Sequence, residues 1–167
     1  MNLYNRQVGL VDIHTVDTLE ELSRFVDRND LELFIHEEMK PYHDSIPAIS
    51  KCLDYVFSPD KGKGGYVLLA RENDCLIGVT VVNYSGMDEY IPSVFLVYIA
   101  VKDSHRGRGI GSSMIRRVIE NGPGSVALHV EYDNPAKKLY ESIGFVSKYA
   151  EMRYDGDLVN GRSKDTH

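Results

Sequence analysis

A basic, glycine-rich segment is the part of the sequence best suited to chemistry. It reads Arg106-Gly107-Arg108-Gly109-Ile110-Gly111-Ser112 and stands between an apolar run and an amphipathic stretch. A turn of this kind at the start of a helix presents consecutive backbone N–H groups, and the helix dipole there favours an anion. Glycine allows a phosphate to approach the backbone closely, and the two arginines add charged donors. The segment therefore predicts a pyrophosphate site, and the plainer alternative is a solvated basic loop.

A dinucleotide is one candidate ligand for such a turn. A Rossmann fingerprint has Gly-x-Gly-x-x-Gly and an acidic residue about 20 positions further on. Gly107 and Gly109 fit the first two glycines and Glu131 lies at a suitable spacing, but Ser112 stands at the third glycine position. Residues 102–106 also separate the apolar run from the glycines, where the fingerprint has an immediate turn. The pattern therefore argues against a dinucleotide fold.

The elements expected around the turn alternate between strand and helix. Hydrophobic spacing predicts a strand over 93–101 before the turn and a helix over 109–120 after it. Beyond that helix the pattern predicts a strand, a helix and a strand, over 125–131, 134–142 and 145–154. Upstream it predicts a first strand over 8–16 and then three helical stretches, which begin after 17, after 30 and from 45. Two further strands are predicted over 66–70 and 76–84.

This order of elements predicts the α/β class. We expect a mixed, mostly antiparallel sheet flanked by helices, with a β-α-β-α-β C-terminal half. A chain of 167 residues is the size of one domain. We assign residues 1–154 to that domain and expect a flexible polar tail over 155–167.

Composition excludes several classes of protein. The net charge of −6 argues against a general nucleic-acid binder. The longest apolar run, over 94–101, is too short to span a bilayer, and the first six residues lack the apolar core of a signal peptide. Cys52 and Cys75 form neither a disulfide framework nor a metal-binding motif. We therefore expect a soluble cytoplasmic protein without a metal site.

Two motifs together resemble a known family. Arg106-x-x-Gly109-x-Gly111 resembles the Arg/Gln-x-x-Gly-x-Gly/Ala signature of the GNAT superfamily of acetyl-CoA-dependent N-acetyltransferases. Downstream, Asn134, Tyr140 and Gly144-Phe145 resemble its second hallmark, Asn-x-x-x-x-x-Tyr-x-x-x-Gly-Phe. The two motifs occur in the family's order, with a helix and a strand predicted between them. The resemblance is close over 93–154 and only architectural before that.

The resemblance implies acetyl-CoA as cosubstrate and assigns a part of it to each segment. The strand end Ile99-Ala100-Val101 would pair its backbone with the pantetheine arm, and the backbone over 106–112 would hold the pyrophosphate. Asn134 would bond the pantetheine portion, and Lys137 or Lys138 could reach the adenosine 3′-phosphate.

The reaction implied by the family needs an acid and a base. Tyr140 can protonate the departing CoA thiolate, because its phenol is neutral at pH 7; its alternative role is a core tyrosine. Histidine side chains in general can exchange a proton near neutral pH, so His129 is the candidate base. The strand over 93–101 carries no carboxylate, so Glu131, Glu89 and Asp88, or a water relay, remain alternatives to His129.

Charge is distributed unevenly along the chain. Residues 1–60 hold 12 acidic and 5 basic side chains, whereas residues 102–117 hold 1 acidic and 5 basic ones. In this superfamily the acidic region would shape the acceptor site, with four candidate residues: Glu32, Glu37, Glu38 and Asp44. A negative approach favours a cationic acceptor, a small amine or a peptide amine. The chain could form a homodimer. The function that competes with acetyl transfer is that of a CoA-binding regulatory domain without turnover.

Overall fold

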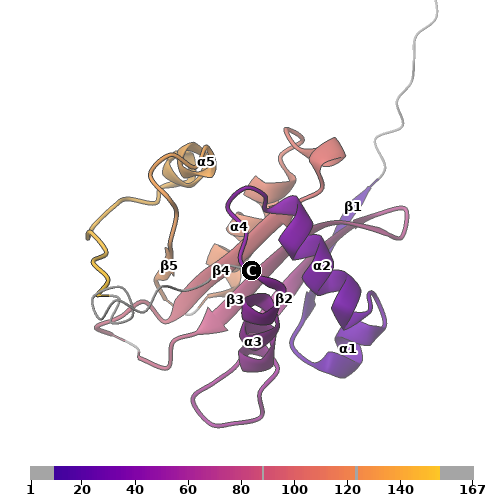
Figure 1. Cartoon of the computed structure of the whole chain (residues 1–167), viewed down its shortest axis with the longest axis horizontal. Helices are drawn as coiled ribbons and strands as arrows, with labels where there is room; N and C mark the ends of the chain where they lie inside the picture. Colours follow the sequence, from indigo (N-terminus) through magenta and orange to yellow (C-terminus); the bar gives the residue numbers. More distant parts are fainter. Residues whose placement is uncertain (1–9, 88, 123, 155–167) are drawn as a thin grey trace, which may run out of the picture.

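A five-stranded sheet forms the centre of the fold (Figure 1). The computed structural model describes residues 10–87, 89–122 and 124–154. The strands lie in sequence order: β1 (Val11–Val16), β2 (Gly65–Glu72), β3 (Cys75–Tyr84), β4 (Val94–Val101) and β5 (Val126–Leu128). Neighbouring strands are antiparallel except for β4 and β5, which are parallel. The predicted fold class, a mixed and mostly antiparallel sheet, is confirmed.

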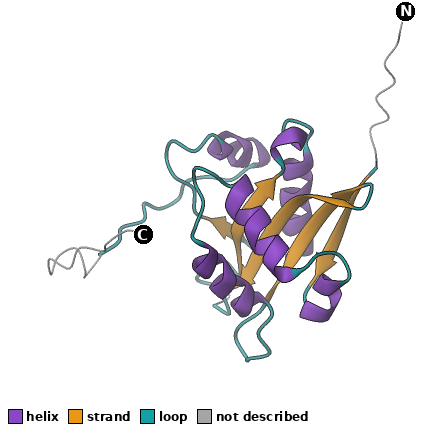
Figure 2. Cartoon of the chain, turned by 45° about the vertical axis from the view of Figure 1, so that its right-hand side comes forward, coloured by secondary structure: helices purple, strands orange, loops and turns teal. Residues whose placement is uncertain are grey.

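Helices cover both faces of this sheet (Figure 2). They are α1 (Leu19–Ser23), α2 (Arg28–Glu38), α3 (Ile46–Val56), α4 (Ile110–Asn121) and α5 (Ala136–Ile143), with a 3₁₀ turn at Asp103–His105. Successive β2 side chains point to opposite faces, so Val67 packs in one core with α2 and α3. Leu68 packs in the other core with α4 and α5. The glycine turn thus lies between β4 and the helix that covers the second core.

The C-terminal part differs from the prediction. The segment over 145–154, expected as a strand, forms none, and the strand expected over 125–131 is reduced to Val126–Leu128. A strand over 145–154 needs a long edge to pair with, and β5 is too short to supply one. Val146 and Tyr149 are accordingly exposed. The tail predicted over 155–167 and the first residues of the strand predicted from Val8 lie outside the described residues.

Membrane-crossing elements were not expected from the hydropathy pattern. Among the described residues, none of the helices combines the length and the apolarity that a membrane crossing requires.

Tyr66 provides a test of the second core. Its side chain is 4% exposed, and its buried hydroxyl has no hydrogen-bond partner among the described residues. Because burying an unpaired hydroxyl is costly, Tyr66→Phe should raise the free energy of unfolding by about 1 kcal/mol, as measured by urea denaturation. A loss of more than about 1 kcal/mol would show that the hydroxyl contributes a bond.

The same substitution should alter alkaline stability. Burial raises the pKa of Tyr66 to about 12, above its ordinary value of 10.0. The folded state therefore holds this proton more tightly than the unfolded chain does. Its contribution to stability is complete below pH 10 and is lost as the pH rises toward 12. Tyr66→Phe should lose less stability than the parent over that interval.

Candidate active site

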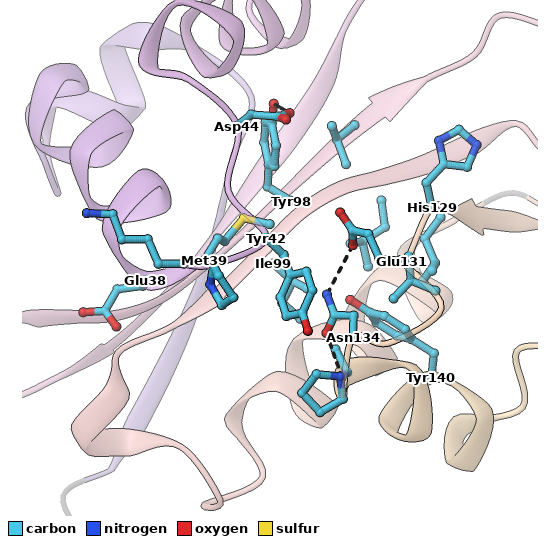
Figure 3. Close-up of a pocket in the computed structure, with 18 of the residues that line it drawn as sticks. Glu38, Met39, Tyr42, Asp44, Tyr98, Ile99, His129, Glu131, Asn134 and Tyr140 are labelled. Atoms are coloured by element: carbon cyan, nitrogen blue, oxygen red, sulfur yellow. Dashed lines mark hydrogen bonds between the residues drawn. The ribbon is translucent and has the colours of Figure 1, made fainter. Parts of the chain in front are cut away.

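A cleft of about 600 Å³ opens where β4 and β5 separate (Figure 3). The two strands pair only from Val94 to Leu96 on β4, opposite β5. A shift in the β3–β4 register leaves Val97 without a partner on β3, which is a β-bulge. From Val97 to Val101 the β4 edge facing the cleft has no neighbouring strand in the described chain. An open edge of this kind can hydrogen-bond an extended ligand.

The predicted pantetheine segment lies on this edge. Ile99 and Val101 line the cleft, while the side chain of Ala100 is buried on the other side of the strand. This arrangement follows from the alternation of side chains along a strand. The backbone of all three residues thus lies along the open edge of β4, and its pairing with the pantetheine arm stays a prediction.

The glycine turn enters α4 in a conformation that depends on glycine. Gly107 and Gly109 have φ values of 74° and 79°, in the left-handed region that other residues adopt with strain. Gly109 is the N-cap of α4. The backbone amide of Ser113 donates a 3.0 Å hydrogen bond to the carbonyl oxygen of Gly109. In the described chain the amides from Gly107 to Ser112 have no protein acceptor. The turn therefore presents several unpaired donors to an anion.

The two arginines of the turn bind protein oxygens. Arg106 donates to the carbonyl oxygens of Glu38, at 2.7 Å, and Val101, at 3.0 Å. Arg108 donates to both carboxylate oxygens of Glu72, at 2.5 and 3.3 Å, and these bonds lower the pKa of Glu72. The guanidiniums thus fix the turn to α2 and to the end of β2, and the free donors are the backbone amides.

Tyr140 combines a buried ring with an accessible hydroxyl. The side chain is 7% exposed, and its ring lies against Phe145 with centroids 5.9 Å apart. The hydroxyl points into the cleft (Figure 3), where no described residue is bonded to it. Burial, with a smaller contribution from the charge of Glu131, raises the pKa of Tyr140 to about 12. Both sequence-based roles, core residue and proton donor, fit this placement.

Asn134 and Glu131 lie beside Tyr140. The Asn134 side chain accepts a bond from the amide of Ala136 at 2.9 Å, which helps to begin α5. Its amide nitrogen donates to a carboxylate oxygen of Glu131 at 3.4 Å. Both residues line the cleft, and the bond from Asn134 to the pantetheine portion stays a prediction.

The candidate bases occupy different positions. His129 lines the cleft, but its ring points away from Tyr140 and lies near Phe95, with centroids 6.1 Å apart (Figure 3). Glu131 lies on the Tyr140 side of the cleft. Glu89 is exposed and does not line the cleft, and Asp88 lies outside the described residues. The geometry therefore favours Glu131 over His129.

The lysines proposed for the 3′-phosphate lie outside the cleft. Lys137 stacks over the ring of Tyr132, with its Nζ 5.7 Å from the centroid, and lies 3.8 Å from a carboxylate oxygen of Glu141. Lys138 is exposed. The contacts of these two lysines therefore give no support to a role in binding the 3′-phosphate.

Only some of the predicted acids reach the cleft. Asp44 and Glu38 line it. Glu32 is buried against Arg28, and Glu37 forms an exposed pair with Lys40, so both lie outside the cleft.

Sequence reasoning missed several side chains of the lining, among them Tyr42, Tyr98 and Arg153. The hydroxyl of Tyr42 donates to the carbonyl oxygen of Asp133 at 3.3 Å, which links the α2–α3 loop to the β5–α5 loop. Tyr98 was recognisable as the main polar side chain of its strand, but the bulge that directs it is a property of the register. Arg153 lies in the segment that was expected to be a strand.

Solved structures show that other proteins share the fold of this domain. Aminoglycoside N-acetyltransferase AAC(6')-Iy, in complex with CoA, is 16% identical; the match covers 90% of this chain and 97% of that chain, with a TM-score of 0.63. An integron cassette protein from the mobile metagenome of V. cholerae is 25% identical, over 90% and 96% of the two chains, with a TM-score of 0.60.

The family itself is identified from the sequence. Residues 63–147 match the model of the Acetyltransferase (GNAT) domain family, and this is half of the chain. The chain therefore belongs to the GNAT acetyltransferase domain family, a family of acyltransferases, and the resemblance stated above is confirmed.

Curated relatives are mycothiol acetyltransferases. That of Corynebacterium jeikeium is 37% identical over 70 residues, which are 39% of this chain and 20% of the relative. That of Corynebacterium glutamicum is 28% identical over 94 residues, 51% of this chain and 32% of the relative. The chain thus spans between a fifth and a third of the length of these relatives.

Proposed function

We propose that this chain transfers an acetyl group from acetyl-CoA to a primary amine, by direct attack within a ternary complex. The observation that carries the proposal is the Tyr140 hydroxyl, which is held protonated and faces a cleft lined by the open edge of β4. The glycine turn, with its unpaired amides, begins at the end of that edge. A proton donor and an anion site are thereby joined by an extended binding edge.

The described residues fit acetyl-CoA part by part. The amides over 107–112 suit the pyrophosphate, because they are donors at a helix N-terminus without protein partners. The backbone of Ile99 and Val101 suits the amides of the pantetheine arm. The solved AAC(6')-Iy structure, which has the same fold, holds CoA.

The reaction requires one group that donates a proton to the leaving sulfur and one group that accepts a proton from the amine. The neutral amine nitrogen attacks the thioester carbon, the C–S bond breaks, and Tyr140 gives its proton to the departing sulfur. The nitrogen meanwhile loses a proton, which the Glu131 carboxylate accepts directly or through water. His129 is the alternative acceptor. Loss of an ionisation from the pH profile of kcat/KM in Glu131→Gln, and not in His129→Ala, would assign this role.

The proposal is tested by thiol release from acetyl-CoA with a panel of primary amines, together with mass spectrometry of the product. The expected result is release that depends on the acceptor and matches the amount of acetylated amine. Binding of CoA without acceptor-dependent release would contradict the proposal. That outcome would favour a CoA-binding regulatory domain.

Arg106→Lys tests whether the arginine positions the turn or only supplies charge. Lysine keeps the charge but cannot reproduce the two bonds that the guanidinium makes to Glu38 and Val101. Since each of the two bonds contributes about 1 kcal/mol, KM for acetyl-CoA should rise by up to about 30-fold with little change in kcat. The matched control is Arg117→Lys on the exposed face of α4. An unchanged KM would mean that charge alone matters.

A further inference from the structure

A carboxylate is held in a fixed orientation at the end of the cleft opposite Tyr140 (Figure 3). It belongs to Asp44, in the loop between α2 and α3, and its Oδ2 accepts a 2.7 Å hydrogen bond from the Tyr98 hydroxyl. The backbone carbonyl of the same residue lies 2.8 Å from Nδ1 of His36. Both the loop and the side chain are therefore oriented by neighbours.

Tyr98 makes this orientation rigid. The residue is 5% exposed and follows the bulge at Val97, which sets the direction of its side chain. A buried phenol that donates to an exposed carboxylate leaves the second carboxylate oxygen, Oδ1, available to a ligand. No described residue donates a hydrogen bond to Oδ1 of Asp44.

The surroundings of Asp44 favour a cationic ligand. In the described chain it forms no ion pair within 4.0 Å, although it is a charged group on the wall of a cleft. The neighbouring cation is Arg153, which is 74% exposed and paired with Glu151. Glu151, and to a smaller extent Asp44, raise the pKa of Arg153. Arg153 thus lies within the electrostatic field of Asp44, although the described ion pair of Arg153 is with Glu151.

A second and independent observation marks the same cleft as a ligand site. Tyr140 is more than nine-tenths buried, and its hydroxyl points into the cleft without a partner. The cleft therefore has two ends: Tyr140 with Glu131 on the β5–α5 side, and Asp44 with Tyr98 on the α2–α3 side. A molecule that spans them meets a reaction site at one end and an anion at the other.

We infer that Asp44, oriented by Tyr98, binds a second, non-reacting ammonium group of the acceptor, so that the acceptor is a diamine or polyamine. The inference rests on the proposed function for the identity of the reacting end, and on the Asp44–Tyr98 contact for the other end. A charge-assisted bond to an oriented carboxylate contributes about twice as much as a neutral bond. Tyr98 is a positioning residue, because it acts through Asp44.

The test compares 1,4-diaminobutane with 1-aminobutane, which has the same carbon chain and one ammonium group fewer. Calorimetry in the presence of CoA measures the dissociation constant of each amine for the parent, Asp44→Asn and Tyr98→Phe. The parent should bind the diamine at least 10-fold more tightly than the monoamine. The ratio should fall to about one in Asp44→Asn and to an intermediate value in Tyr98→Phe. Glu37→Gln, which removes an acid outside the cleft, should keep the ratio of the parent.

Equal binding of the two amines by the parent, or an unchanged ratio in Asp44→Asn, would overturn the inference. Thiol release is measured on the same samples and separates this result from failure of the proposed function. Acetyl transfer to both amines without a preference would remove only the role of Asp44. Selective diamine binding without thiol release would support that role and contradict acetyl transfer.

Discussion

Gly109→Glu should weaken CoA binding by about 100-fold or more, as measured by calorimetry. The N-cap of α4 has φ of 79° at this position, which costs a residue with a side chain about 1–2 kcal/mol. Space is not the obstacle, because no atom lies within 4 Å of the position that a Cβ would take. The added carboxylate would instead stand at the N-terminus of α4, where the proposed pyrophosphate must bind. Strain and charge repulsion therefore act together.

Gly62→Glu is a matched control for this variant. Gly62 has φ of 88°, also has open space around its Cβ position, and lies in the turn between α3 and β2, outside the cleft. The control carries the same strain and the same added charge. It should bind CoA as the parent does. Equal affinities in both variants, or equal losses, would contradict the placement of the pyrophosphate.

Tyr140→Phe should lower kcat by about 100- to 1000-fold, in the range that general acids contribute. The phenyl ring keeps the packing against Phe145, so the fold and the affinity for acetyl-CoA should change little. Only the proton that the thiolate needs is removed. Steady-state kinetics with a saturating amine separate the effect on kcat from that on KM.

Tyr66→Phe is the control for the loss of a buried hydroxyl. Burial raises the pKa of both tyrosines to about 12, but only the Tyr140 hydroxyl faces the cleft. The control should therefore retain the activity of the parent. The raised pKa also means that Tyr140 keeps its proton from pH 7 to pH 10. A fall in kcat over that interval that disappears in Tyr140→Phe would contradict the assigned role.

Local sequence patterns were sufficient for the glycine turn and for most helices. Gly107 and Gly109 stand where the backbone needs a positive φ, which few other residues tolerate. Ser45 caps α3 through the amide of Ala48, where the hydrophobic spacing predicted a helix from residue 45. These features depend on residues within one turn of each other, so a single sequence can reveal them.

Features that join distant residues could not be predicted in this way. The bulge at Val97 depends on the register with β3, and the cleft depends on β5 ending at Leu128. The Arg108–Glu72 pair joins residues 36 positions apart, and the Tyr98–Asp44 bond joins residues 54 apart. No local pattern encodes such contacts.

The segment over 145–154 also shows the limit of prediction from local sequence patterns. Its strand-like composition could not reveal that β5 is too short to pair with it. A strand forms only where a neighbouring strand offers free backbone groups, and that condition is set by the whole sheet.

A crystal structure of the chain with CoA tests the central claim most directly. We predict that the pyrophosphate oxygens lie within hydrogen-bond distance of the amides over 107–112, and that the thiol sulfur lies beside the Tyr140 hydroxyl. The pantetheine arm between them should run along β4 at Ile99 and Val101. A pyrophosphate bound away from the glycine turn, or a sulfur outside the reach of Tyr140, would contradict the account.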